Sequence, residues 1–324
     1  LVEQVLGQRQ ALVQGQANLP HLYPWAALTL GAQGQQMAAL AELAETPIVG
    51  FADGQGIQNP LLMQRLLQYL QPLGKPVALW PCDLTLRDGG VAREGPFSLM
   101  YGLVGDPATS ETSALAALLE IVALVASPVH LMRIATARGV ELVHQAKQRG
   151  LPITASTTWM HLLFSTQDLQ DYNPNLRLDP PLGNPEDQAA LLEGVKAGVI
   201  DAIAIDHTPH TYEDKTVGFA TAPAGAIGLE LAWGILWHRL VEQGACPPLT
   251  LIEALSTRPA RCWGQPPPTI QPQQPAEMVL FDPASRWLVS PDSLQSQSAN
   301  TPWLGETLQG RVVRTWVPDS QSIE

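Results

Sequence analysis

An aspartate and two histidines stand close together in the stretch "IAIDHTPH", residues 203 to 210. Asp206 ends an apolar, strand-like run, and His207 and His210 follow it directly. A carboxylate at the carboxyl end of a buried parallel strand can bind a metal ion and accept a proton from an attacking water. The cluster is typical of a metal-dependent hydrolase. An aspartate that caps the next turn, followed by two exposed histidines, explains it equally well at this point.

Six apolar, strand-like runs occur along the chain, and Asp206 ends the last of them. The runs cover residues 24–31, 47–53, 76–83, 129–136, 152–158 and 201–206. Between them lie segments with apolar residues at helical spacing, at 60–72, 111–126, 139–150 and 186–198. Alternating strands and helices predict an α/β fold with a parallel sheet. A (β/α)8 barrel needs eight strands, so either two βα units are absent from this chain or the sheet is open and doubly wound.

The pattern changes near residue 265. A Pro- and Gln-rich stretch, "GQPPPTIQPQQPAE", precedes short alternating segments at 277–283, 286–291 and 310–317. These segments predict a few antiparallel strands in a small β domain. We therefore divide the chain into a β/α barrel over 1–264 and the C-terminal part of a small β-sandwich domain over 265–324. A further helix-like run covers residues 1–16.

The composition excludes several classes of protein. The chain has 324 residues, a net charge of −12 and 45% hydrophobic residues, which predicts a large core and no phosphate-neutralising surface for nucleic acid. No run is long and apolar enough to cross a bilayer, so we expect no membrane partner and a cytoplasmic protein. The three cysteines have no close spacing, which argues against a disulfide framework or a thiolate zinc site.

Several longer strings together resemble the dihydroorotase family of cyclic amidohydrolases. They include "YPWAALTLG", "LDPPLGNPEDQAALLEGVKAGVIDAIA", "IAIDHTPHTYEDK", "LSTRPARCWG" and "NTPWLGETLQGRVV", in the family's order. The resemblance implies a TIM-type barrel with zinc at its mouth, a small β domain, and interconversion of carbamoyl aspartate and dihydroorotate. It also implies that roughly a hundred upstream residues, with the first two βα units and a His-x-His metal motif, are absent here.

The resemblance locates the family's metal ligands one position at a time. Asp53, in "GFADGQG", matches a family carboxylate, and Asp206 matches the aspartate of the last strand. The histidine of the family's "H-C-E-D" strand end is replaced by Trp80, with Asp83 the only match in that motif. A second family histidine is replaced by Arg133 in "HLMRIAT". Asp53 and Asp206 are thus the metal ligands expected here if any metal is bound.

The family's substrate-binding positions also change. Asp179 stands where the family has an asparagine before paired prolines, and Ala224 replaces the phenylalanine before Gly225. His210 survives. The resemblance implies that these four positions line the substrate pocket.

The replacements act directly on metal affinity. An indole N–H is only a donor and a guanidinium is permanently cationic, so neither Trp80 nor Arg133 can ligate zinc. A guanidinium ~4 Å from a divalent ion costs about 8 kcal/mol at an effective dielectric of 20. We expect instead that Arg133 forms an ion pair with Asp206 and supplies the positive charge that a metal would have supplied.

Two functions follow. The favoured one is a catalytically impaired, dihydroorotase-like protein of pyrimidine biosynthesis that acts as a structural or assembly partner. Aspartate carbamoyltransferase is the candidate partner, because inactive dihydroorotase-like chains are known to scaffold it. The alternative is an active zinc-dependent dihydroorotase or other cyclic amidohydrolase, with Asp206 catalytic in a reduced metal site. In either case the resemblance implies a homo-oligomer.

Overall fold

A parallel sheet forms the centre of the molecule in a computed structural model that describes residues 4, 7, 20–267, 269–274 and 276–317. Its strands follow the order β1-β2-β3-β6-β7-β8. The strand bounds are Trp25–Ala26 for β1, Gly50–Phe51 for β2, Val77–Leu79 for β3, Val129–Leu131 for β6, Ile153–Thr158 for β7 and Ala202–Ala204 for β8. All six strands predicted from the sequence are confirmed, each shorter than its apolar run. The helix expected over 1–16 lies almost wholly outside the described residues.

Helices connect the strands in the expected alternation. Their bounds are Leu40–Ala44 (α2), Pro60–Leu70 (α3), Leu84–Arg87 (α4), Pro96–Met100 (α5), Thr109–Val125 (α6), Ala137–Gln148 (α7), Trp159–Leu163 (α8), Pro185–Lys196 (α9), Tyr212–Lys215 (α10), Ala232–Leu236 (α11), Pro248–Leu255 (α12) and Thr257–Cys262 (α13). A π-helical turn, Trp237–Val241, continues α11. The four helices predicted from the sequence are confirmed as α3, α6, α7 and α9.

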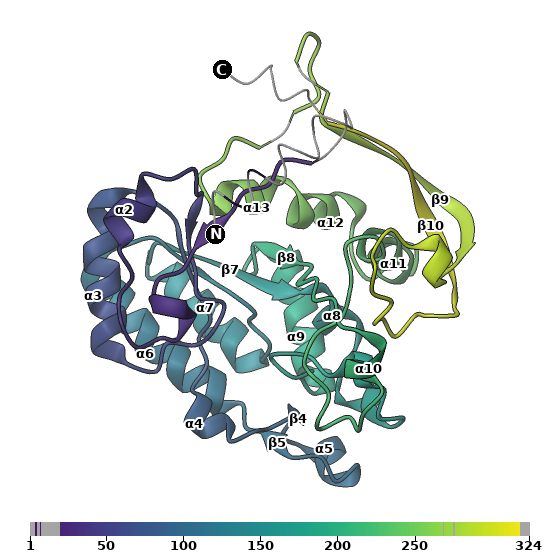
Figure 1. The fold of residues 1–324 in the computed structure, drawn as a ribbon, viewed down its shortest axis with the longest axis horizontal. Helices are drawn as coiled ribbons and strands as arrows, with labels where there is room; N and C mark the ends of the chain where they lie inside the picture. The colour runs from purple at the N-terminus through teal and green to yellow at the C-terminus, as the bar shows by residue number, and fades with distance from the viewer. Residues whose placement is uncertain (1–3, 5–6, 8–19, 268, 275, 318–324) are drawn as a thin grey trace.

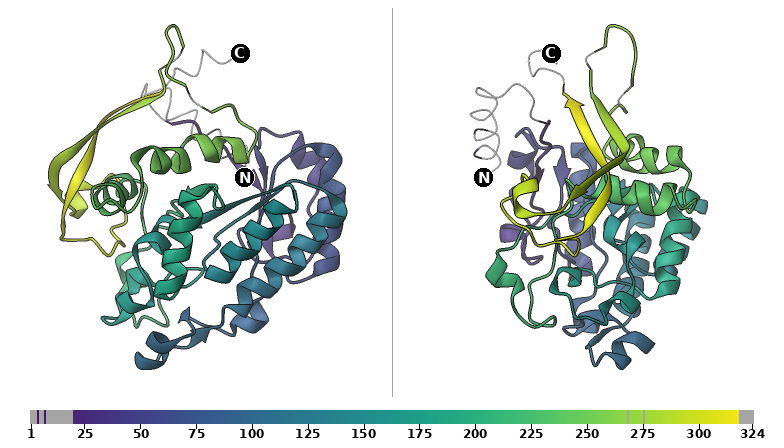
Figure 2. Two further views of the ribbon diagram at one scale, coloured as in Figure 1. Left: turned by 180° about the vertical axis from the view of Figure 1, so that it is seen from behind. Right: turned by 90° about the vertical axis from the view of Figure 1, so that its right-hand side faces the viewer.

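Two of the four predicted helices, α3 and α7, begin where local chemistry favours a start. Asn59 accepts hydrogen bonds from the first turn of α3, and Pro60 occupies the first helical position, where no N–H is needed. Thr136 caps α7 in the same way. The helices then lie side by side along one face of the curled sheet, as Figures 1 and 2 show, and bury leucines such as Leu66 and Leu118 against it. This packing holds the carboxyl ends of the strands at one common edge.

Between α4 and α6 the chain forms a small additional segment outside the main sheet, which the sequence did not predict. Two strands of two residues each, β4 (Ala92–Arg93) and β5 (Gly105–Asp106), pair in parallel around α5. They are too short to produce a recognisable alternating pattern. This segment lies at the bottom of Figure 1 and delivers Arg93 and Asp106 to the interior.

The C-terminal region forms a two-stranded antiparallel ribbon of β9 (Met278–Leu288) and β10 (Thr307–Trp316). The expectation of separate strands at 277–283 and 286–291 is wrong, because β9 runs through both. Pro283 lacks an N–H, yet it interrupts nothing, since the ladder has no paired residue between Asp282 and Arg286. An edge strand tolerates such a gap.

Aromatic side chains attach the ribbon to α11. The rings of Trp233, Trp237 and Phe281 lie with centroids 5.5 to 5.7 Å apart. Gly234 faces the backbone of Gly310, and a Cβ at Gly234 would lie only 2.7 Å from the Gly310 carbonyl oxygen. The ribbon can approach the helix this closely because position 234 has no side chain.

Gly234→Ala is expected to lower the free energy of unfolding by about 1–3 kcal/mol, because the added methyl group must displace backbone. Urea unfolding followed by tryptophan fluorescence measures this change. Gly218→Ala is the control, since its Cβ would meet nothing closer than Thr221 Oγ1 at 3.7 Å. Equal midpoints for the two variants would contradict the assigned packing.

Candidate functional site

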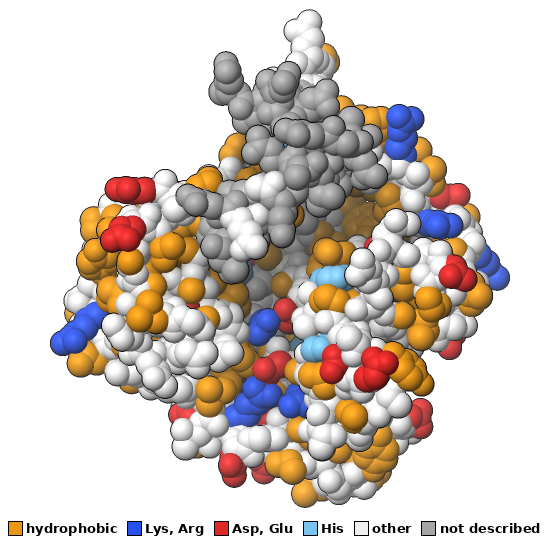
Figure 3. Space-filling model, viewed as in Figure 1, with side chains coloured by type: hydrophobic (Ala, Val, Ile, Leu, Met, Phe, Trp, Pro, Cys, Tyr) orange, Lys and Arg blue, Asp and Glu red, His pale blue; other side chains and the backbone are white. Residues whose placement is uncertain are grey.

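A cavity of about 400 Å³ opens at the carboxyl ends of the strands. Four of its lining residues are charged: Arg87, Arg133, Asp179 and Asp206. Figure 3 shows the corresponding hollow near the centre of one face, with basic and acidic side chains lying next to each other in it. Parallel α/β folds place their active sites at this edge, so the cavity is the candidate site.

Arg133 and Asp206 meet inside the cavity, as the sequence led us to expect. Arg133 Nη2 donates to Asp206 Oδ1 at 2.9 Å, and Nη1 donates to the Gly54 carbonyl at 3.2 Å. The two side chains are 23% and 31% exposed, so the pair is screened only in part by solvent. The guanidinium therefore occupies the space beside the one strand-end carboxylate that could still bind a metal.

Both partners of this ion pair have an unusual backbone. The φ angles of Arg133 and Asp206 are 58° and 50°, in the left-handed region that favours glycine. Such a conformation costs of the order of 1 kcal/mol for each residue that carries a Cβ. The surrounding structure thus holds both residues in strained positions from which their side chains reach one another.

Trp80 lies beneath this pair and links it to a second one. The Arg133 guanidinium lies 5.3 Å from the centroid of the Trp80 ring, and the Arg87 guanidinium lies 5.9 Å from it. Arg87 Nη1 in turn contacts Asp179 Oδ1 at 2.5 Å. Trp80, which stands where the family has a metal-binding histidine, therefore supports two cations by cation–π contact. The Trp80 residue itself is buried, with 4% exposed.

Two aspartates that matched family positions have structural roles here. Asp53 accepts hydrogen bonds from the Leu28 and Thr29 amides and from the Thr29 hydroxyl, at 2.5 to 3.0 Å. It fixes the loop after β1 and does not line the cavity. Asp83 caps α4 by accepting from the Thr85 and Leu86 amides. Both carboxylate oxygens of Asp53, and Oδ1 of Asp83, already have partners within the protein.

The two histidines of "IAIDHTPH" hold a loop. His207 Nδ1 accepts from the Gly228 and Leu229 amides at 3.1 and 3.3 Å, and burial lowers the pKa of its imidazole. His210 Nε2 lies 2.9 Å from the Ala224 carbonyl oxygen, so this nitrogen must be the donor. Neither histidine lines the cavity, whereas Ala224 and Gly225 do. His210 thus acts on the pocket through the backbone it supports.

The residues of this site do not fit a zinc ion. In the part of the chain that the structure describes, no group of three or more His, Cys, Asp and Glu side chains is placed to hold a metal. Asp53 is committed to the β1 loop, and Asp206 is paired with Arg133. Zinc sites in proteins need three or four such ligands together. This arrangement offers one carboxylate, with a fixed cation against it.

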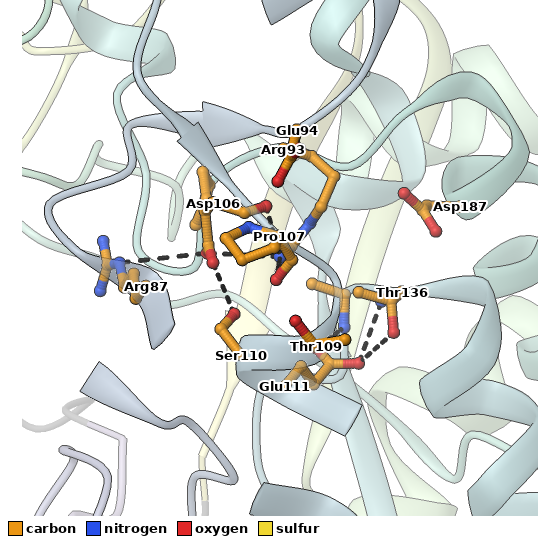
Figure 4. Close-up of polar contacts among 12 residues, drawn as sticks. Arg87, Arg93, Glu94, Asp106, Pro107, Thr109, Ser110, Glu111, Thr136 and Asp187 are labelled. Atoms are coloured by element: carbon orange, nitrogen blue, oxygen red, sulfur yellow. Dashed lines mark hydrogen bonds and ion pairs between the residues drawn. The ribbon is translucent and has the colours of Figure 1, made fainter. Parts of the chain in front are cut away.

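A buried carboxylate anchors the segment that carries Arg133. Glu111, at the start of α6, accepts from the amides of Ala135 and Thr136 and from the Thr136 hydroxyl, at 2.6 to 3.2 Å (Figure 4). Asp187 accepts from the next amide, that of Ala137, at 2.7 Å. Burial raises the pKa of Glu111 to about 7, and the nearby Arg93 opposes this rise. The two carboxylates hold the strand end from which Arg133 projects.

Sequence reasoning missed Arg87 and Glu111. Glu111 opens a long amphipathic helix, where an acidic residue normally faces solvent. Arg87 lies in a four-residue helix that has no periodicity to read. A signal for Arg87 did exist, because an aspartate at position 179, where the family has an asparagine, adds a charge that requires a partner.

Comparison with known proteins places the chain among cyclic amidohydrolases. No family model matches it. A "Probable dihydroorotase-like protein" of Synechocystis sp. is 48% identical over 297 residues, which cover 89% of this chain and 66% of the relative. A dihydroorotase of Pelotomaculum thermopropionicum is 37% identical over 291 residues, covering 90% and 68%. The chain thus spans about two thirds of the length of these curated relatives.

Solved structures agree on the fold. The L-hydantoinase of Arthrobacter aurescens superposes with a TM-score of 0.80 at 21% identity, over 98% of this chain and 72% of the hydantoinase. The curled sheet with its outer helices is therefore part of a TIM-type amidohydrolase barrel. Within that class, the sequence relatives show that the chain belongs to the dihydroorotase family. None of the described helices is long and apolar enough to cross a membrane.

The titration of Glu111 leads to a pH-dependent prediction. Its pKa is about 7 in the folded protein against 4.5 for an ordinary glutamate, so the folded state favours the protonated form. This contribution to stability is complete below pH 4.5 and is lost as the pH rises through 7. Relative to Glu111→Gln, the wild type should lose up to about 3 kcal/mol of unfolding free energy over that range.

Urea unfolding at a series of pH values measures the difference between the two proteins. Glu120→Gln is the control, because the Glu120 side chain is 72% exposed on the same helix. Parallel pH profiles for wild type and Glu111→Gln would show that Glu111 titrates normally.

Proposed function

We propose that this protein is a dihydroorotase-like member of pyrimidine biosynthesis that no longer performs the family's metal-dependent hydrolysis and acts in assembly. The observation that carries the proposal is the Arg133–Asp206 ion pair over Trp80. It supplies a fixed positive charge at a position where hydrolysis would need an exchangeable metal ion and a metal-activated water. Aspartate carbamoyltransferase is the candidate partner, from the resemblance to inactive chains of this family.

Electrostatics supports the loss of metal chemistry. A divalent cation beside Asp206 would meet the Arg133 guanidinium, and Arg133 cannot release a proton to relieve the repulsion. Moving Arg133 away would also break its bond to Gly54 and its contact with Trp80. The ion pair with Asp206 would be lost too, so metal binding would have to compensate three lost contacts with few ligands.

An active, zinc-dependent amidohydrolase with a reduced site is the second candidate. Asp206 favours it, because its carboxylate is 31% exposed, lines the cavity and follows the last strand of the sheet. In this alternative Arg133 would swing away, Asp206 would serve as the catalytic base, and the substrate would be a cyclic amide.

Metal content separates the two candidates. We expect the full-length protein, purified without chelator, to hold less than about a tenth of an equivalent of zinc, unchanged after zinc addition and desalting. Trp80→His combined with Arg133→His should raise the retained zinc, because both replacements restore imidazole ligands and remove a cation. Elemental analysis by mass spectrometry gives both values.

The control for this measurement is Arg149→His, which removes an arginine paired with Glu120 on the surface, where the two side chains are 54% and 72% exposed. It should leave the zinc content unchanged. One or more tightly held zinc ions in the wild type would contradict the proposal and favour the active amidohydrolase.

Assembly is tested with aspartate carbamoyltransferase from the same organism. Size-exclusion chromatography with light scattering should show one species that contains both chains and dissociates on dilution. Trp80→His/Arg133→His should co-elute equally well, because assembly does not depend on the metal site. Separate elution of the two proteins at about 10 μM of each would exclude this partner at ordinary affinities.

A further inference from the structure

An exposed apolar surface lies on α5 and the loop that follows it. Leu99, Met100 and Val104 are 79%, 70% and 57% exposed. The sequence around them, "GPFSLMYGLVG" at residues 95–105, contains no charged residue. Figure 3 shows hydrophobic side chains at the lower end of the molecule, where Figure 1 places α5. None of residues 95–105 lines the strand-end cavity, so this region, here called the α5 surface, is separate from that site.

Hydrogen bonds hold the α5 surface in place. The buried Ser98 hydroxyl accepts from the Gly95 amide at 3.0 Å, at the start of α5. The Tyr101 hydroxyl donates to the Gln167 carbonyl at 3.2 Å, and the Tyr172 hydroxyl donates to the Tyr101 carbonyl at 2.8 Å. A surface that is fixed before it binds loses little conformational freedom on binding. The α5 surface is therefore preorganised for contact.

The stability of the fold does not account for these side chains. An apolar side chain that stays in water gains no free energy of burial, so polar residues at positions 99 and 100 would suit the fold as well. Single exposed apolar residues are common, but here three occur within six positions that carry no charge. The centres of protein interfaces are depleted of charge and enriched in Met and aromatic residues, as this surface is. The composition therefore indicates an interface.

The border of the α5 surface is acidic. It is formed by segments 91–107 and 165–172, which meet where α5 contacts a 3-10 turn, Thr166–Leu169. The exposed charged residues of the two segments are Glu94, Asp168 and Asp171. Their other charged residues, Arg93 and Asp106, are 1% and 2% exposed and pair with each other. The two segments thus present negative charge around an apolar centre and expose no basic side chain.

We propose that the α5 surface is the assembly surface of this protein, and that it docks in an apolar pocket of another protein whose border carries Lys or Arg. Such a border complements the acidic one, and complementary charge steers the two proteins together. The inference rests on the proposed function, because it names the surface through which the proposed assembly forms.

Two other occupants fit this surface less well. A two-fold contact between copies brings the same residues together, so the acidic borders of two chains that each carry a net charge of −12 would repel. An anionic membrane or a nucleic acid would meet the same repulsion.

The binding test uses the full-length protein and aspartate carbamoyltransferase from the same organism, with affinity measured by isothermal titration calorimetry. Leu99→Asp combined with Met100→Asp should weaken binding at least about 30-fold, as the loss of a central apolar contact does. Leu124→Asp is the matched control, because Leu124 is 70% exposed on α6, and it should bind as the wild type does. Thermal unfolding of the three proteins shows whether both variants remain folded.

The acidic border is tested with Asp171→Asn. At about 50 mM salt this change should weaken binding about threefold, and at about 500 mM salt it should have little effect, because screening removes the contribution of an exposed charge. The Leu99→Asp/Met100→Asp loss should persist at both salt concentrations. A defect of folding would not follow the salt concentration in this way.

Two outcomes would overturn this inference and leave the proposed function standing. One is equal binding of aspartate carbamoyltransferase by the wild type and by Leu99→Asp/Met100→Asp. The other is self-association of the wild-type chain alone that the same double change abolishes, because it would assign the α5 surface to a second copy.

Photocrosslinking inside the producing organism decides the case in which aspartate carbamoyltransferase does not bind the wild type. The crosslinking amino acid p-benzoylphenylalanine replaces Leu99 in one protein and Leu124 in the other. A crosslink from position 99 to one site of a second protein, beside Lys or Arg and absent from position 124, would support the α5 surface and overturn only the named partner. Equal crosslinking from the two positions, or none, would overturn both ideas.

Discussion

The mouth of this barrel depends on one ion pair, between Arg133 after β6 and Asp206 after β8. These strands are not neighbours, because β7 lies between them, and the curl of the sheet brings their ends together. Neither charge is stable there alone, since each is mostly withdrawn from water. Two features keep the groups in contact. The backbone is strained at both residues, and Glu111 and Asp187 anchor the segment that follows Arg133.

A fixed cation changes what the site can do. A metal ion exchanges, polarises water and accepts several ligands, whereas a guanidinium only donates hydrogen bonds in one plane. Trp80 completes the change, because its ring supports Arg133 and Arg87 and cannot itself bind metal. Charge balance at the mouth is therefore retained without a metal ion, and in the proposed function hydrolysis loses its electrophile. A chain can therefore belong to the dihydroorotase family and use the same cavity for a different purpose.

The sequence predicted the six strands, the four long helices and the Arg133–Asp206 contact, because periodicity marks regular elements and an unpaired buried charge requires a partner. It misplaced the strand ends, which depend on where the ladder's hydrogen bonds stop. It divided β9 at Pro283, although an unpaired edge position tolerates proline. Arg87 and Glu111 were missed because their contacts are made with residues distant in the chain, Asp179 and the segment after β6.

The wall around Arg87 is difficult to explain by stability alone. Replacing partly buried ion pairs with apolar side chains of similar size is often neutral or stabilising, so pairs such as Arg87–Asp179 are a costly way to fill space. Apolar residues would also have closed the cavity, whereas charged groups must keep access to water or to a ligand. The cavity remains open, with buried guanidinium donors left unmatched beside it. The mouth of the barrel therefore keeps an open, charged surface where an apolar filling would have been less costly.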